Sequence, residues 1–136
     1  MTSRPTLYPH MQYRDAPAAI RWLEKAFGFR TVMSHPDGNG GVAHAELAFG
    51  NGMIMLGSCK DNGLPMTMPK DAGGNTQGVY AVVKDTDALY AQARAAGAEI
   101  VMTIRDTDYG SRDFSARDPE GHLWSFGTYA PEFPEV

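Results

Sequence analysis

The pattern of apolar and polar residues predicts a strand, a helix and three further strands in the first part of the chain. The helix covers residues 16–27, where apolar residues recur at helical spacing between Asp15, a suitable N-cap, and Gly28, a suitable helix end. Strand patterns lie on both sides of it, at residues 7–14, 29–35, 42–49 and 53–57. Asn51 and Gly52, between the last two strands, predict a hairpin with a type I′ turn.

The second part of the chain repeats this order. A helix is predicted from about Asp85 to Ala96, with Gly97 as its end. Strand patterns surround it at residues 78–83, 98–104, 112–117 and 122–128. The shared element order, helix caps and turns indicate a duplication. We therefore predict an α+β fold of two tandem βαβββ modules.

Residues 1–136 are predicted to form one domain, with modules at about 5–57 and 77–130. The connector between them, about residues 58–76, has no periodicity, and a stretch of this length is either a linker or a lid. Leu64, Met66 and Met68 alternate with polar or small residues. Part of the connector is therefore able to pack over an apolar cavity.

Composition excludes several classes of function. The 136 residues carry a net charge of -4 and lack the clustered basic charge that nucleic-acid binding requires. The longest apolar stretches have the length of strands, so no membrane-spanning segment is predicted. The single cysteine, Cys59, cannot form an intrachain disulfide, and the start of the chain lacks the apolar core of a secretion signal. A cytoplasmic location is expected.

The paired modules and three stretches carry a resemblance to a known family: RDAPAAIRWLEKAFGF, VAHAELAFGNGMIMLG and the run from AGAEIVMTI to DPEGHLWSFGTY. From about Leu7 to Tyr129 the chain resembles the vicinal oxygen chelate superfamily, and within it a branch of uncharacterised bacterial glyoxalase-like proteins. The superfamily includes glyoxalase I, bleomycin-resistance and fosfomycin-resistance proteins, and extradiol dioxygenases. The resemblance implies two curled sheets that face each other around a small-molecule cavity. It also implies a homodimer, sometimes with exchanged modules.

Metal-using members of this superfamily take ligands from the first and last strand of each module. Counting from the helix caps and turns puts the matching positions at Tyr8, Leu56, Gly78 and Ser125. None of these residues offers the imidazole, thiolate or carboxylate that Zn, Fe or Mn prefers. We therefore predict that no metal or other cofactor is bound.

His44 and Glu46 are the first candidates for chemistry, because residues two apart on a strand share one face. Three interpretations stay open. The two side chains contact each other or a ligand in the cavity, or they face solvent. Alternatively, with His10, they form a divalent-metal site of two histidines and one carboxylate. By the strand order usual in this family, His10 lies two strands, roughly 9–10 Å, from His44.

The loop DTDYGSRDF brings Tyr109 close to Arg112. Arg112 either clamps an anionic ligand or pairs with one of three carboxylates, at Asp106, Asp108 or Asp113. Trp124 faces either the cavity or the helices. His122 is expected to tie the DPEG turn together by bonding the backbone or Asp118.

We therefore predict a protein that binds a small organic molecule in the cavity between its modules without the family's usual metal. The predicted ligand contacts are His44, Glu46, Tyr8, His10, Tyr109, Arg112 and Trp124. The alternative is an enzyme, namely a glyoxalase-like lyase, an isomerase or a dioxygenase, with His44 and Glu46 as its catalytic residues. A third class is a purely structural or interaction module.

Overall fold

The computed structural model describes residues 4–60 and 63–134. The elements of the first module are β1 (His10–Tyr13), α1 (Ala16–Phe27), β2 (Arg30–Pro36), β3 (Val42–Phe49) and β4 (Gly52–Ser58). Their strands form a four-stranded sheet in the order β1-β4-β3-β2. β1 runs parallel to β4, and the other neighbours are antiparallel.

The second module has the same plan. Its elements are β5 (Gly78–Val82), α3 (Thr86–Ala95), β6 (Glu99–Asp106), β7 (Arg112–Arg117) and β8 (Leu123–Gly127). The sheet order is β5-β8-β7-β6, which repeats that of the first module. The predicted α+β fold and its duplication are therefore confirmed. Within residues 4–60 and 63–134, no helix is long and apolar enough to cross a membrane.

The predicted helix caps are present. The Asp15 carboxylate accepts a hydrogen bond from the backbone N–H of Ala18 at 3.1 Å, and Asp85 accepts one from Ala88 at 3.0 Å. Gly28 ends α1 with a φ of 83°. Glycine adopts this left-handed conformation without steric cost, so the chain turns directly from α1 into β2.

The hairpin between β3 and β4 is confirmed, but the predicted type I′ turn is wrong. Phe49 pairs with Gly52, so the loop consists of Gly50 and Asn51. Gly50 has a φ of 56°, whereas no non-glycine residue in the described part of the chain has a positive φ. A type I′ turn needs positive φ at both loop residues, and here glycine alone takes that conformation.

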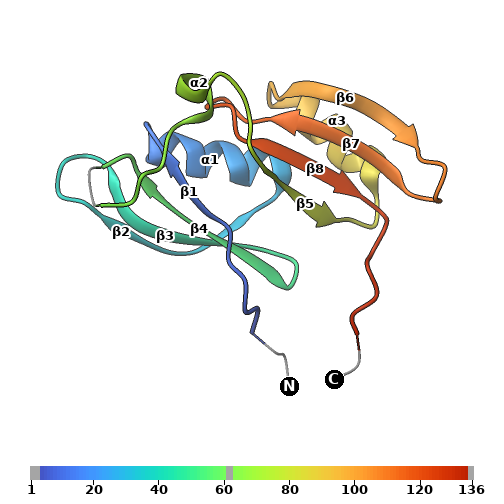
Figure 1. The fold of residues 1–136 in the computed structure, drawn as a ribbon, viewed down its shortest axis with the longest axis horizontal. Coiled ribbons are helices and arrows are strands. Elements are labelled where there is room, and N and C mark those ends of the chain that lie inside the picture. Colours follow the sequence, from blue (N-terminus) through green and yellow to red (C-terminus); the bar gives the residue numbers. More distant parts are fainter. Residues whose placement is uncertain (1–3, 61–62, 135–136) are drawn as a thin grey trace.

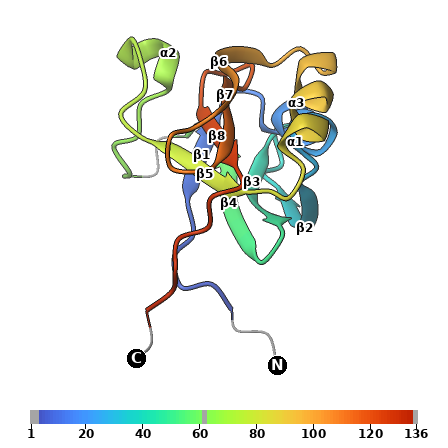
Figure 2. The same cartoon turned by 90° about the vertical axis from the view of Figure 1, so that its right-hand side faces the viewer.

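The two sheets lie side by side, with α1 and α3 on one side of both and the connector on the other (Figures 1 and 2). A continuous core under the helices joins the modules, because the ring of Phe27 in α1 lies 4.7 Å from Phe126 and 5.7 Å from Trp124, both in β8. Trp22 of α1 also donates to the Ala96 carbonyl after α3 at 2.9 Å. Neither four-stranded sheet is closed, and the faces turned away from α1 and α3 stay open.

The connector is a strap across the molecule that includes a short helix, α2 (Pro69–Ala72), which the sequence pattern did not predict. Met68, directly before α2, is buried, whereas Met66 is exposed. On the side of the first module, Asp71 of α2 forms an ion pair with Arg14. The connector is therefore anchored rather than a free linker.

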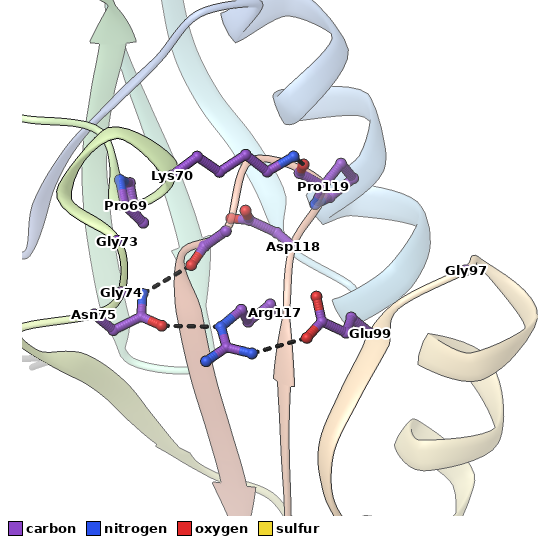
Figure 3. A pocket seen from close by; sticks show the side chains of 11 residues that line it. Pro69, Lys70, Gly73, Gly74, Asn75, Gly97, Glu99, Arg117, Asp118 and Pro119 are labelled. Carbon is purple, nitrogen blue, oxygen red and sulfur yellow. Dashed lines mark hydrogen bonds and ion pairs between the residues drawn. The ribbon is translucent and has the colours of Figure 1, made fainter.

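Side chains also tie the connector to the second module (Figure 3). Lys70 Nζ donates to the Pro119 carbonyl at 2.9 Å. Asn75 Nδ2 donates to the carbonyl of Gly121 at 2.8 Å, and Asn75 Oδ1 accepts from Arg117 Nε at 3.0 Å. These bonds hold the strap over the seam where the modules meet.

Candidate functional site

A row of four side chains crosses the open face of the first sheet. Strand pairing places Met33 opposite Glu46, Glu46 opposite Met55, and Met55 opposite His10. Paired residues share a face of the sheet, and Leu47, next to Glu46, points into the core instead. The row therefore combines two ionisable groups with two thioethers on a face that α1 does not cover.

His44 and Glu46 form a hydrogen-bonded pair on this face. His44 Nε2 lies 2.9 Å from Glu46 Oε2, and the side chains are 37% and 29% exposed. The two residues share a face as predicted, and of the interpretations that the sequence left open the structure agrees with the one in which the two side chains contact each other. Because both residues lie on β3, their hydrogen bond does not connect different strands or helices. The pair combines an acid and a base that a ligand on the open face can reach.

The strand register corrects three of the four predicted metal positions. Leu56 is 0% exposed and points into the core, whereas Met55, one residue earlier, lies on the open face opposite His10. His10 therefore takes the place of the predicted Tyr8. In the second module, Tyr80 rather than the predicted Gly78 lies opposite Ser125. One imidazole, a thioether and two hydroxyls do not fit Zn, Fe or Mn. The first and last strands therefore lack the donors of the metal-using members.

The structure does not assemble the alternative metal site of His10, His44 and Glu46. Met55 stands between His10 and Glu46 in the row, so two strand spacings, roughly 9–10 Å, separate those side chains. Among the residues that the structure describes, no three His, Cys, Asp or Glu side chains are placed to hold a metal ion.

A recess of about 430 Å³ lies at the seam between the modules. Residues of β1, the connector, β5 and the turn before β8 line it, among them His10, Met66, Gln77, Gly78 and His122. Of the predicted ligand contacts, His10 lines this recess. Tyr8 is half-buried just before β1. His44 and Glu46 lie on the open face of the first sheet but do not line the recess.

Arg112 is engaged in ion pairs, which supports the interpretation that it orders its loop. Its Nε and Nη2 donate to the two carboxylate oxygens of Asp87 at 2.9 and 3.0 Å, and Nη1 donates to Asp106 at 3.0 Å. The hydrogen bonds to Asp87 raise the pKa of Arg112, and the bond to Asp106 raises it further. In return, the hydrogen bond from Arg112 lowers the pKa of Asp87. Asp87, at the start of α3, is a partner that the sequence did not suggest.

Tyr109 belongs to a cluster that ties Tyr129, just after β8, to the start of β7. Its side chain is 62% exposed, and its Oη donates to Asp113 Oδ2 at 3.2 Å. The Ser111 hydroxyl donates to the other oxygen of Asp113 and accepts from Tyr129 N at 2.9 Å. Tyr80 Oη donates to the Tyr129 carbonyl at 2.8 Å. The hydroxyl of Tyr109 therefore has a structural partner.

Trp124 faces the helices, which corrects its place among the ligand contacts. It is 0% exposed, and its Nε1 donates to Asp118 Oδ2 at 3.1 Å. The same oxygen accepts from Tyr13 Oη at 2.7 Å, while Oδ1 accepts the N–H groups of Glu120 and His122 at 3.0 Å each. Burial raises the pKa of Tyr13 well above its usual value, and the negative charge of Asp118 raises it further.

The DPEG turn clasps the two modules together. Glu120 accepts the backbone N–H groups of Arg14 at 2.6 Å and Asp15 at 2.9 Å, where β1 leads into α1. His122 Nε2 lies 2.9 Å from the Gln12 carbonyl oxygen. His122 thus bonds the backbone as expected, but on β1 rather than within its own turn. Asp118, Glu120 and His122 together form what we call the inter-module clasp.

The protein therefore consists of two paired βαβββ modules, with the His44–Glu46 pair on an open sheet face and a recess between the modules. The family model of the Glyoxalase/Bleomycin resistance protein/Dioxygenase superfamily matches residues 7–126. The chain belongs to this superfamily. Its members typically form dimers and bind small molecules.

Individual relatives support the same assignment. An uncharacterised protein of Mycobacterium bovis is 34% identical over 126 residues, which cover 90% of this chain and 82% of the relative. The crystal structure of TioX from Micromonospora is 32% identical with a TM-score of 0.73, covering 96% of this chain and all of TioX. The fosfomycin resistance protein FosX from Mesorhizobium loti has a TM-score of 0.65, 94% coverage of both chains and 13% identity, which supports the fold alone.

Proposed function

We propose that the protein binds a small organic molecule on the open face of its first sheet without a metal ion, with His44 and Glu46 as polar anchors. The observation that carries this proposal is the 2.9 Å contact of a partly exposed ionisable pair on a face with no helix over it. Small-molecule sites typically combine apolar surface with a few placed polar groups. The pair and the methionines beside it match that description.

The apolar surface around the pair is built from thioethers. Met33 and Met55 flank Glu46 in the row, and both are half-buried. Flexible, polarisable methionine side chains adapt to ligands of different shapes. The Glu46 carboxylate, together with the net charge of -4, favours a ligand that carries positive charge. His10, at the end of the same row, is a further proposed contact, and Tyr8 adjoins it.

A second copy of the chain is proposed to cover the open faces and close the site. Tyr80 and Val82 on β5 and Met102 on β6 are exposed. Apolar residues on an uncovered sheet face favour association, and dimers are typical of the superfamily.

A cytoplasmic location is also proposed. Cys59 is a free, exposed thiol, which suits the reducing cytoplasm.

The replacement Glu46→Gln tests the site. A screen of small organic molecules that includes metal-free bleomycin, run with EDTA present, should identify stabilising ligands of the unmodified protein. We expect Glu46→Gln to bind a cationic hit about tenfold more weakly, because the charge that pairs with the ligand is removed while the shape of the side chain stays. Isothermal titration calorimetry measures the difference.

The control is Glu132→Gln, which makes the same change at an exposed carboxylate outside both sheets. It should leave the affinity unchanged. Equal affinity of the Glu46→Gln and unmodified proteins would contradict the proposed site. If the variant binds its ligand normally but loses a reaction rate, the His44–Glu46 pair acts as a general acid and base, and the enzyme alternative holds.

A further inference from the structure

A pocket of about 340 Å³ lies on the helix side of the molecule, between α1 and the DPEG turn. It is partly enclosed, its lining is mainly apolar, and its size falls within the roughly 300–1,000 Å³ of small-molecule sites. The open face that carries His44 and Glu46 is turned away from α1 (Figure 2), and neither residue lines this pocket. The pocket is therefore a separate candidate site.

One face of α1 forms a wall of the pocket. Asp15, Ala18, Ala19 and Trp22 are spaced so that they share this face, and all four line the pocket. The two alanines leave room that larger side chains would fill. The Trp22 ring is held in place, because its Nε1 donates to the Ala96 carbonyl at 2.9 Å. A preformed wall of this kind reduces the ordering that a ligand would otherwise have to impose.

The second module does not repeat this arrangement. Asp85 caps α3 as Asp15 caps α1, but α3 carries Gln92 at the position where α1 carries Trp22. Gln92 Nε2 donates to the Lys25 carbonyl of α1 at 2.9 Å. Asp85 does not line the pocket. It therefore provides a matched control for Asp15.

Three carboxylates line the pocket beside its apolar surface: Asp15, Asp118 and Glu120. None of them belongs to an ion pair among the described residues. Asp118 and Glu120 accept only neutral donors, as described for the inter-module clasp. Asp15 is exposed, and its Oδ1 accepts the Ala18 N–H, which leaves Oδ2 for a ligand.

The cations near these carboxylates are engaged elsewhere. Arg14, next to Asp15, pairs with Asp71 of α2. Lys70 Nζ donates to the Pro119 carbonyl at 2.9 Å and has no carboxylate partner among the described residues. Three carboxylates thus outweigh one unpaired ammonium group around the pocket. An apolar surface with a negative rim complements a molecule that is both apolar and positively charged.

We propose that this pocket binds an apolar cation, such as an arylalkyl amine, whose ring packs on the alanines beside Trp22 while its ammonium group lies at the Asp15 carboxylate. The inference does not depend on the function proposed for His44 and Glu46. Burial of the ring supplies affinity. The negative rim supplies selectivity over neutral and anionic molecules of the same shape.

The test compares three probes of similar shape, phenethylamine, phenethyl alcohol and phenylacetate, by NMR titration of the isotopically labelled full chain. Phenethylamine should shift the Trp22 indole N–H and the backbone amides of residues 18–22 and 120–121 in a saturable way. We expect the alcohol to bind about fivefold more weakly, because it lacks the charge that faces a partly exposed carboxylate. Phenylacetate should bind more weakly still. Added salt should reduce the advantage of the amine, because salt screens charge interactions.

The replacement Asp15→Asn removes the charge and keeps the helix cap, because asparagine caps helices about as well as aspartate. It should reduce the preference for phenethylamine over the alcohol to less than about twofold. Asp85→Asn makes the same change at the cap of α3 and should preserve the preference. Ala18→Leu fills the space beside Trp22, so it should abolish the binding of all three probes and provides a second test if Asp15→Asn fails to fold.

Several results would overturn the proposal. They are the absence of a saturable shift at Trp22, equal affinity for the amine and the alcohol, a preference that survives in Asp15→Asn, and binding that persists in Ala18→Leu. Tighter binding of phenylacetate than of phenethylamine also overturns it, because the site would then be one for anions. Loss of the Trp22 shift in Glu46→Gln does so as well, since the amine would then bind on the open sheet face.

Discussion

Replacing Asp118 with alanine is expected to lower the free energy of unfolding by roughly 3–5 kcal/mol, the largest effect of any substitution discussed for this protein. Asp118 is 4% exposed and accepts hydrogen bonds from Tyr13, Trp124 and the backbone N–H groups of Glu120 and His122. Alanine leaves these donors without their acceptor inside the structure. Urea denaturation followed by tryptophan fluorescence measures the loss.

The control for this prediction is Asp108→Ala, which removes the same charge from an exposed turn. Its free energy of unfolding should differ from that of the unmodified protein by less than about 0.5 kcal/mol. If Asp118→Ala is as stable as Asp108→Ala, the clasp does not hold the modules together and the role assigned to the DPEG turn is wrong.

Replacing Gly127 with alanine should give the second largest effect, a loss of about 1–3 kcal/mol. A Cβ atom at this position would lie 1.9 Å from Asp113 Oδ1 and 2.7 Å from Tyr80 Oη. Asp113 cannot easily move away, because Ser111 and Tyr109 hold its carboxylate. Thermal unfolding of the variant, monitored by circular dichroism, reports the loss.

Gly74→Ala provides the matched comparison, since a Cβ atom there meets nothing within 4 Å. Its stability should stay close to that of the unmodified protein. A Gly127→Ala variant as stable as Gly74→Ala would show that the Asp113 cluster rearranges without cost, and that it does not fix Tyr129 to β7.

Most of the fold was predictable because local signals agree with the final structure. Asp15 and Asp85 cap helices through their own side chains, and Gly28 turns the chain with a positive φ. These effects act within a few residues, so the sequence displays them directly. The short helix α2 shows no such pattern. It is held by distant partners such as Arg14 and Pro119, which a sequence does not place beside it.

The sequence predicts the candidate site only where the alternation of side chains along a strand determines which face of the sheet a residue lies on. His44 and Glu46 were expected to share a face, and they do. Leu56 was assigned to the wrong face because an error of one residue along a strand reverses the direction of every side chain. For Trp124 the alternation was right, but only the packing of α1 over β8 decides which face is buried.

Arg112 and Trp22 show a different limit. The partner Asp87 lies on α3, and contact with it depends on how α3 packs beside β7. The pocket beside Trp22 gives no sequence signal, since Trp22 and the alanines before it are usually taken as the apolar face of a helix. It becomes noticeable only when the DPEG turn of the other module is placed beside α1.

We propose that this superfamily member binds its ligand without a metal ion. The most direct test is elemental analysis of protein purified without a metal-affinity tag, from cells grown with Fe, Mn, Ni and Zn supplied. Because His10, Met55, Tyr80 and Ser125 do not form a suitable donor set, each metal should be present well below one ion per chain. Near-stoichiometric content of any one of these metals would contradict the account.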